Sequence, residues 1–216
     1  MKDIRKLSWA LVAAVALGAA PALAGDITTD WASAKPPPVP ELKPITVDPK
    51  TTALLVLDFM KANCGQRPRC IATVPNIKKL LDTARAQNIP VFYTMVGQDP
   101  TPAGMVDQSL VPHPNDFIIK GAGGADKFIN SNLDQGLKDK GIKTVIVTGT
   151  SAQGAVGGTA NGAAQRGYKV VVPVDGMSSE DAYNEQYAAW HIYKGGPAAL
   201  VNNATLTRSD LIKFGS

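Results

Sequence analysis

Histidine and cysteine are scarce in this chain of 216 residues, which contains two of each. The two histidines, His113 and His191, lie far apart along the chain, and neither is close to the cysteines. Transition-metal sites are built from clustered histidine, cysteine and carboxylate ligands, so we expect no metal site and no cofactor. Lysine and arginine form no run with interleaved aromatic residues, and we therefore expect no nucleic-acid partner.

Long apolar runs are also missing, except near the N-terminus. That segment reads "MKDIRKLSWALVAAVALGAAPALAGD", with a basic start, an apolar run and small residues before Gly25. The pattern is typical of a secretory signal peptide, residues 1–24, cleaved after Ala24. The apolar run is too short for a stable membrane span. We expect a periplasmic or secreted protein with no membrane attachment after cleavage; an uncleaved N-terminal anchor is the alternative.

Cleavage would remove three basic residues and one acidic residue, which lowers the formal charge from +4 to +2. The next segment, residues 25–48, contains "AKPPPVPELKPITV" and is predicted to be an extended, proline-rich lead-in. No internal repeat follows. The remaining length suits one domain with a sizeable core, so we predict a single domain over residues 49–216.

Predicted strands and helices alternate through this domain. Continuous apolar runs predict strands within residues 52–59, 89–97, 115–120, 143–149 and 168–176. Helical spacing of apolar residues predicts helices over 74–88, 127–141, 152–167 and 181–195. Pro75 suits a first helical turn, and Phe128, Leu133 and Leu137 are expected to face inward. This alternation is typical of a parallel sheet covered by helices on both faces.

Polar residues at the carboxyl ends of such strands face the ligand-binding crevice. Asp58, Lys120 and the segment Gly149–Ser151 all occupy such positions. Burying the Asp58 carboxylate costs several kcal/mol unless it is paired, and Lys120 is the predicted partner. The alternative interpretation is an ion pair that orients the crevice and has no chemical role.

The two cysteines lie close together in "NCGQRPRC", as Cys64 and Cys70. In an exported protein, two cysteines this close are expected to form a small disulfide loop. A reactive Cys64 on a loop above the crevice is the alternative.

Several stretches together resemble the isochorismatase-like hydrolases, which include nicotinamidases, N-carbamoylsarcosine amidohydrolases and true isochorismatases. The matching pieces are "ALLVLDFM", "VFYT", "DFIIKGAGGADKFINSNLDQGLKDKGIKTVIVTGTSAQGAV" and "AAQRGYKVVVPVDGMSS". They cover most of residues 52–179 in the family's order. The resemblance implies a three-layer α/β/α fold with a six-stranded, mostly parallel sheet, an active site at the strand ends, and a homo-oligomer.

The resemblance also implies which residues form the site. The family's aspartate and lysine map to Asp58 and Lys120, and its cis peptide bond maps to Thr150–Ser151. In most members a cysteine lies six residues after the glycine that corresponds to Gly149, and that position is Ala155 here. A methyl group cannot form the covalent intermediate of an amide hydrolase. Nicotinamidase-type chemistry through Ala155 is therefore excluded. The family's metal-binding histidines are missing as well.

True isochorismatases also lack the cysteine and use a carboxylic acid to protonate the substrate. By that resemblance, Asp58 is the predicted general acid/base and Lys120 its electrostatic partner. The Gly154 and Ala155 amides are expected to hold an anionic group. The full set of predicted substrate-binding residues is Gln98, Thr150, Ser151, Gln153 and Gly154. We expect a hydrolase for a small anionic molecule; a catalytically inactive relative that binds a small ligand or acts as a partner subunit is the alternative.

Three glycines spaced by four, Gly154, Gly158 and Gly162, lie along one face of the helix predicted over residues 152–167. Glycine inside a helix costs roughly 0.5–1 kcal/mol relative to alanine, so a compensating role is expected. Close approach of the helix to the sheet or to a partner subunit is one interpretation. Room for a bulky ligand beside Ala155 is the other.

Overall fold

The computed structural model describes residues 25–215, so the expected signal peptide lies outside the described residues. The N-terminal segment that precedes Pro38 contains one short helix, α1 (Ile27–Asp30). The carboxylate of Asp26 caps this helix by accepting hydrogen bonds from the backbone N–H groups of Thr28 and Thr29. Within residues 25–215, no helix has both the length and the apolar character that crossing a membrane requires.

A parallel sheet forms the centre of the unit that begins at Pro38. Its strands lie in the order β4-β3-β2-β5-β6-β8, and the short β7 pairs with the end of β5. The bounds are β2 (Thr52–Leu57), β3 (Val91–Thr94), β4 (Phe117–Ile118), β5 (Thr144–Thr150), β6 (Lys169–Pro173), β7 (Met177–Ser178) and β8 (Ala204–Thr207). This arrangement confirms the predicted three-layer α/β fold, with β7 as a short addition to the six expected strands.

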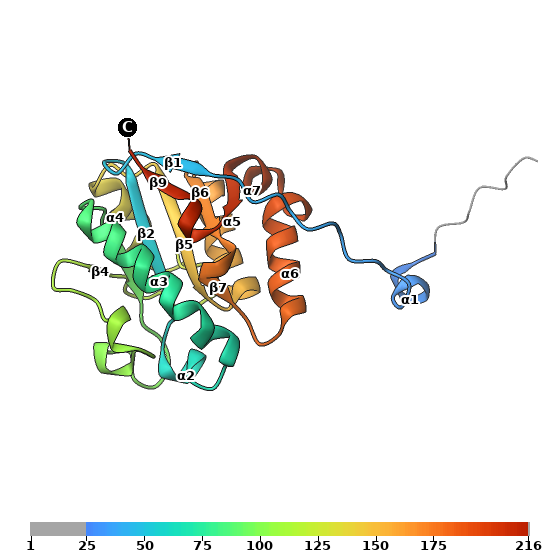
Figure 1. The fold of residues 1–216 in the computed structure, drawn as a ribbon, viewed down its shortest axis with the longest axis horizontal. Helices are drawn as coiled ribbons and strands as arrows, with labels where there is room; N and C mark the ends of the chain where they lie inside the picture. Colours follow the sequence, from blue (N-terminus) through green and yellow to red (C-terminus); the bar gives the residue numbers. More distant parts are fainter. Residues whose placement is uncertain (1–24, 216) are drawn as a thin grey trace, which may run out of the picture. The chain divides into compact units, whose positions relative to one another are not determined.

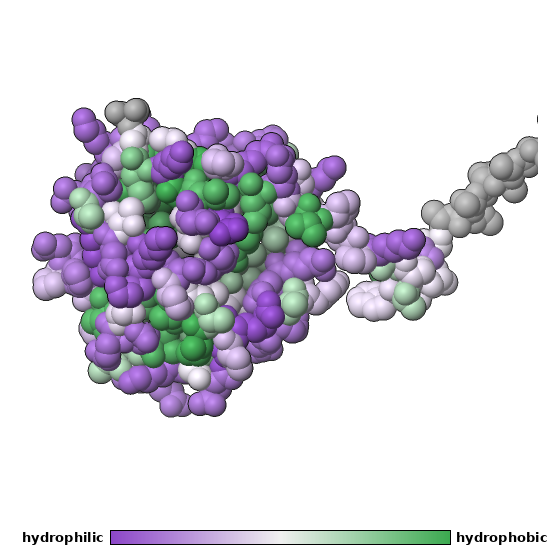
Figure 2. All heavy atoms as spheres, viewed as in Figure 1, coloured by the Kyte–Doolittle hydropathy of each residue, from purple (hydrophilic) through white to green (hydrophobic). Residues whose placement is uncertain are grey.

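The central strand β2 is buried along its whole length because helices cover both faces of the sheet. Leu55 and Leu57 face one core with residues of α5 (Gly157–Gln165) and α7 (Ala198–Asn203), whereas Leu54 and Val56 face a second core with residues of α3 (Pro68–Ala86). Alternation of this kind follows from the two-residue period of a strand. Figure 1 shows α3 crossing the sheet on one side, and Figure 2 shows mostly hydrophilic side chains on that face, with smaller hydrophobic groups between them.

The helices are shorter or begin elsewhere than the sequence predicted. Their bounds are α2 (Lys61–Cys64), α3 (Pro68–Ala86), α4 (Leu133–Asp139), α5 (Gly157–Gln165), α6 (Ala182–Trp190) and α7 (Ala198–Asn203). Helix α3 begins at Pro68, so the prediction of a start near Pro75 was wrong: Pro68 takes the first-turn position, and Pro75 lies inside the helix. Helix α4 begins at Leu133 because residues before it form turns, although Phe128, Leu133 and Leu137 are buried as expected.

Short π-helical turns precede or extend two of the helices. One, Ala152–Val156, links the end of β5 to α5, and the other, His191–Gly195, continues α6. Gly167, the last residue of the helix predicted over residues 152–167, ends the α5 region with a φ of +86°. Short 3-10 turns occupy Pro102–Gly104, Gln108–Leu110, Val174–Gly176 and Ser209–Leu211.

The proline-rich lead-in joins the fold earlier than expected. Strand β1 (Ile45–Val47) pairs in parallel with β9 (Ile212–Phe214) near the C-terminus. The side chain of Thr207 also donates to the backbone oxygen of Lys43, 2.7 Å away. The boundary predicted at residue 49 is therefore too late, because backbone pairing holds Ile45–Val47 against the domain.

A disulfide bond joins Cys64, at the end of α2, to Cys70, in the first turn of α3. Both cysteines are fully buried. The sequence contains no other cysteine, so the prediction of a small disulfide loop is confirmed and the alternative of a reactive Cys64 is not.

Replacing both cysteines, Cys64→Ala with Cys70→Ala, should lower the free energy of unfolding by about 2 kcal/mol, because the bridge restricts the unfolded chain over a short loop. Chemical denaturation followed by circular dichroism measures the change. Wild-type protein treated with a reductant separates loss of the bridge from loss of the sulfur atoms. An unchanged denaturation midpoint in both samples would contradict the prediction.

Candidate functional site

Asp58 follows β2 directly, at the edge of the sheet where neighbouring strands also end. Leu57 pairs with Thr94 of β3 and with Gly149 of β5, so the residues after these positions meet at one level. Asp58 has a φ of +60°, a conformation that few residues other than glycine adopt. Its backbone N–H donates to the Thr94 hydroxyl at 3.0 Å, which fixes the turn in the chain. An unusual backbone conformation held by such contacts is typical of functional sites.

The Asp58 carboxylate has a partner on each oxygen. Lys127 Nζ lies 2.7 Å from Oδ2, and the Thr94 hydroxyl donates to Oδ1 at 2.5 Å. The side chains of Lys127 and Asp58 are only 2% and 8% exposed. Lys127 Nζ also donates to the backbone oxygen of Ala122 at 3.2 Å. Both charges are therefore buried as a hydrogen-bonded pair, which is the arrangement that makes buried charges tolerable.

The predicted partner of Asp58, Lys120, does not form this pair. Lys120 is exposed, and its backbone N–H donates to the side chain of Asn132 at 2.8 Å. The chain turns at Gly121, where φ is +84°, and returns to the sheet edge seven residues after Lys120. That path places Lys127 over Asp58. The pairing expected from the sequence was thus right for the aspartate and wrong for the lysine.

Helix α5 holds the segment that carries Lys127. A Cβ atom on Gly158 would lie 2.8 Å from the backbone of Ala125, and one on Gly162 would lie 2.4 Å from the Asp126 carboxylate. The Thr159 hydroxyl accepts the backbone N–H of Lys127 at 3.2 Å. The close approach was predicted to be to the sheet or to a partner subunit, whereas at Gly158 and Gly162 the neighbour in the structure is the loop before α4. Gly158 and Gly162 allow the contact that positions the lysine.

Burial raises the pKa of the Asp58 carboxyl above its usual value, because the charged form loses its hydration. The positive charge of Lys127 and the hydrogen bonds from Lys127 and Thr94 oppose that increase. The position of the pKa therefore depends on the lysine. A change that weakens the effect of Lys127 favours the protonated acid.

A cleft of about 360 Å³ opens beside this ion pair. Asp58, Lys127, Thr150, Ser151, Gly154 and Ala155 all line it. The bond between Thr150 and Ser151 is cis, as the sequence comparison predicted. Ala155 as a whole residue is 5% exposed. Asn63 of α2 and Arg67, which lies between the bridged Cys64 and Cys70, also line the cleft. The cleft thus combines an acid, two cations and several small residues.

Two residues expected in the site lie elsewhere. Gln98 is exposed and does not line the cleft. Gln153 faces a separate small pocket beside His191, and its side-chain oxygen accepts a hydrogen bond from the Ser179 hydroxyl at 2.7 Å. Both predictions relied on sequence proximity to the strand ends, and neither side chain turns toward the cleft.

Sequence reasoning also missed four residues of the site. They are Asn63, Arg67, Thr94 and Lys127. Thr94 is the last residue of β3. The expectation that polar residues at the carboxyl ends of strands face the crevice was therefore sufficient to find it. Lys127 directly precedes Phe128, which was predicted to face the core. That prediction was the one sequence signal that pointed to burial near Lys127. Nothing in the local sequence points to Arg67.

Of the two backbone amides predicted to hold an anionic group, Gly154 and Ala155, the Gly154 amide already has a hydrogen-bond partner. The Gly154 N–H donates to the backbone oxygen of Ser151 at 3.2 Å, as does the Val156 N–H. These amides are used to close the π-helical turn. Within residues 25–215, no group of three or more histidine, cysteine, aspartate and glutamate side chains is gathered in a way that could hold a metal ion.

Comparison with known proteins gives a family match and several relatives. Residues 52–204 match the family model described as the isochorismatase domain. An uncharacterised isochorismatase family protein, YecD, of Escherichia coli O157:H7 is 28% identical over 173 residues, which cover 69% of this chain and 91% of YecD. The secreted isochorismatase effector Isc1 of Verticillium dahliae is 31% identical over 120 residues, which cover 51% of this chain and 62% of Isc1.

Solved structures show the same fold. A cysteine hydrolase from Pseudomonas syringae pv. phaseolicola superposes with a TM-score of 0.67 at 21% sequence identity, over 79% of this chain and 94% of that protein. At this identity the similarity establishes the fold.

A double-mutant cycle tests the buried ion pair. Asp58→Asn should lower the free energy of unfolding by about 3 kcal/mol, because it leaves the Lys127 ammonium buried without a counter-charge. Lys127→Met should cost less, since the remaining carboxyl can take up a proton. The double variant should be more stable than the sum of the single effects by about 2 kcal/mol. Urea denaturation of the four proteins gives these values, and additive effects would show that the pair does not interact.

Proposed function

Because the chain belongs to the isochorismatase family, we propose that it is an exported hydrolase that acts on a small anionic substrate without a cysteine nucleophile. The observation that carries this proposal is the buried, paired Asp58 beside a cleft lined by Ala155, the residue that the sequence resemblance aligns with the family's cysteine. Asp58 is the proposed general acid/base. Lys127, in place of the predicted Lys120, is its electrostatic partner.

The proposed reaction moves one proton out and back. Protonated Asp58 donates its proton to the substrate, and water attacks the resulting electron-poor carbon. The attacking water then returns a proton to the Asp58 carboxylate, which leaves an adduct with a hydroxyl and the leaving group on the same carbon. The bond to the leaving group breaks as the proton of that hydroxyl passes to the leaving oxygen, and the carbon becomes a carbonyl. Lys127 stabilises the carboxylate between the two transfers. No covalent intermediate is needed, so the methyl group of Ala155 is compatible with this chemistry.

An anionic substrate supports the acid form of Asp58. Lys127 lowers the pKa of Asp58, in opposition to burial. A negative charge bound in the cleft offsets the positive charge of Lys127 and so raises the pKa of the neighbouring carboxyl. Substrate binding and protonation of the catalytic acid are thereby coupled.

Export is supported by two observations besides the N-terminal sequence pattern. The Cys64–Cys70 bridge is of a kind that persists in oxidising compartments, and one relative, Isc1, is a secreted protein. The predicted homo-oligomer remains a prediction.

A catalytically inactive, ligand-binding relative is the second candidate. It is favoured by the same alanine, because the family's usual nucleophile is missing, and by the closed ion pair, which gives Asp58 a partner before any substrate is present. The two candidates differ in whether Asp58 turns over a substrate.

The pH dependence of hydrolysis tests the role of Asp58. If the protonated acid reacts, kcat/KM on an active member of a panel of vinyl ethers and small esters should fall tenfold per pH unit above the pKa of Asp58. Asp58→Asn should lower kcat by about 100-fold or more, since it removes the proton donor. Lys127→Met should move the pH limit upward, because the charge that lowers the pKa is removed.

Lys120→Met is the matched control for the lysine variant, since it removes the same charge outside the ion pair and should leave the pH limit in place. Circular dichroism verifies that each variant is folded. Equal turnover by wild-type protein and Asp58→Asn would contradict the proposal, and absence of turnover across the panel would favour the inactive candidate.

Introducing a thiol at position 155 tests whether the site is electropositive. In Ala155→Cys the new side chain is the only free thiol, because Cys64 and Cys70 are bridged. Lys127 lines the same cleft, so the thiol should alkylate with an apparent pKa below the usual value of about 8.5. The rate of iodoacetamide labelling against pH, read by mass spectrometry, measures it. An apparent pKa at or above the usual value would contradict an electropositive site.

A further inference from the structure

Arg67 is a second cation on the wall of the cleft. It lies between α2 and α3, inside the loop closed by the Cys64–Cys70 bridge. Its guanidinium Nη2 is 3.1 Å from the carboxylate of Glu180, which lies on the segment between β7 and α6. The Arg67 side chain is 31% exposed and that of Glu180 is 69% exposed. Arg67 lines the cleft beside Asp58 and Ala155, whereas Glu180 does not.

We propose that Arg67 recognises the carboxylate of a small monocarboxylate substrate and releases Glu180 when it does so. This inference rests on the proposed function, because it assigns the substrate class of the same site. Arginine suits the task because its planar guanidinium matches the two oxygens of a carboxylate. The carboxylate of Glu180 already binds this guanidinium, and a substrate carboxylate would present the same chemical group.

The charges around the cleft favour a single negative charge. Asp58 and Lys127 neutralise one another in a buried pair. Arg67 is the remaining charged group among the residues that line the cleft. Its partner Glu180 is mostly exposed, and exposed ion pairs of this kind contribute at most about 1 kcal/mol. A substrate carboxylate can therefore replace it.

The backbone at Arg67 is fixed before any ligand binds. Its N–H donates to the backbone oxygen of Cys64 at 2.9 Å, and its own backbone oxygen accepts the N–H of Cys70 at 2.9 Å. The disulfide bond closes the same short segment. Holding the loop in place reduces the entropy that carboxylate binding must overcome. The bridge is thus also a support for the recognition residue.

Other donors near Ala155 are less suited to the carboxylate. The Gly154 N–H, expected from the sequence to hold an anion, donates to Ser151. Lys127 Nζ is already bound to Asp58 and to the Ala122 oxygen. The cleft volume of about 360 Å³ accommodates a small molecule that reaches from Arg67 to Asp58. The geometry places the charged end of the substrate at Arg67 and the reacting bond at Asp58.

Benzoate and benzamide provide a matched pair of probes, since they share a shape and differ in charge. Binding of each to the full-length mature protein is measured by NMR titration at constant ionic strength. Wild-type protein should prefer benzoate. Arg67→Gln should weaken benzoate binding about tenfold, as loss of a charge-assisted hydrogen bond predicts, and should leave benzamide binding unchanged. Retained benzamide binding shows that the variant is folded.

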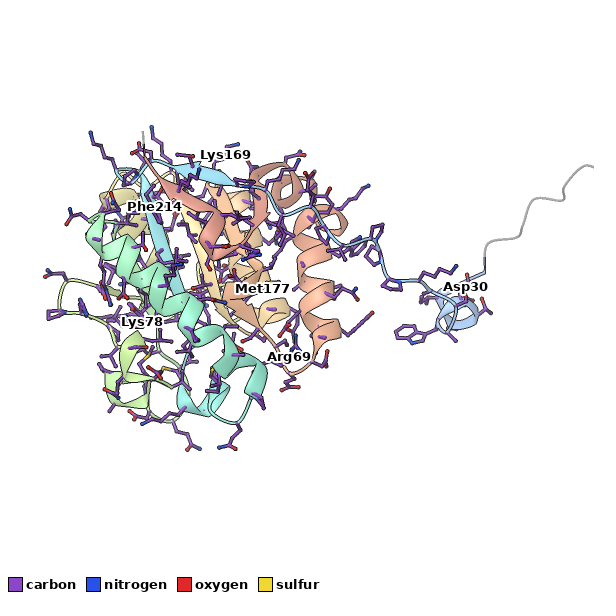
Figure 3. All side chains as sticks on the ribbon, viewed as in Figure 1. Asp30, Arg69, Lys78, Lys169, Met177 and Phe214 are labelled. Carbon is purple, nitrogen blue, oxygen red and sulfur yellow. A yellow bond between two sulfur atoms is a disulfide. The ribbon has the colours of Figure 1, made fainter. Side chains whose placement is uncertain are left out.

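Two further variants sharpen the test. Glu180→Gln should strengthen benzoate binding about threefold, because it removes the competing carboxylate from Arg67. Arg69→Gln is the matched control: Arg69 is two residues away at the start of α3 (Figure 3), pairs with Glu185, and does not line the cleft. It removes the same net charge and should leave benzoate binding unchanged.

Failure of this inference is distinguishable from failure of the proposed function. Benzoate binding needs no turnover, so hydrolysis and recognition are read separately. If Arg67→Gln binds benzoate as wild-type protein does, if Arg69→Gln weakens it equally, or if benzoate shows no binding, the assignment of Arg67 is overturned even where Asp58-dependent hydrolysis is observed. If the expected shifts appear without hydrolysis of any panel compound, the carboxylate site stands and the hydrolase proposal does not.

Discussion

The ion pair between Asp58 and Lys127 is the interaction on which the rest of the site depends. Two opposite charges lie almost fully buried, 2.7 Å apart, at the carboxyl end of the central strand. Neither charge is stable there alone, because each would lose its hydration without compensation. The surrounding elements are arranged so that both are satisfied: Thr94 donates to the carboxylate, and the Ala122 oxygen accepts from the ammonium. The pair thus joins the end of β2, which carries Asp58, to the loop that carries Lys127, and α5 holds that loop in place.

That requirement explains features that otherwise look unrelated. Helix α5 is rich in glycine because the loop carrying Lys127 passes against Gly158 and Gly162. Thr159 then binds the backbone of Lys127 from the same helix face. On the other side of the cleft, the disulfide bond holds Arg67 and Asn63 next to the same strand end. Packing on one wall and a covalent link on the other thus define one polar cleft.

The cleft holds a buried acid paired with an amine, and it is lined by Ala155, the residue that the sequence resemblance aligns with the family's cysteine. Membership of the isochorismatase family establishes the fold and the hydrolase relationship. The proposed chemistry follows from which groups remain: a carboxyl whose pKa burial raises, a lysine that opposes that increase, and an arginine at the rim. Acid–base hydrolysis can use all of these groups. Thiol chemistry also needs a sulfur atom, which Ala155 does not provide.

The sequence by itself determined the parallel α/β/α fold, the place of Asp58 at a strand end, the Cys64–Cys70 bridge and the cis bond before Ser151. These follow from apolar runs, from short sequence separations and from a family pattern, all of which are local in the chain. Only the tertiary structure decided that Lys127 and not Lys120 meets the carboxylate, that Arg67 lines the cleft and that Gln98 does not. Strand ends of a parallel sheet meet because of register, whereas the path of a loop depends on what packs against it. Here the glycine face of α5 and the turn at Gly121 direct that path, and no local pattern records either contact.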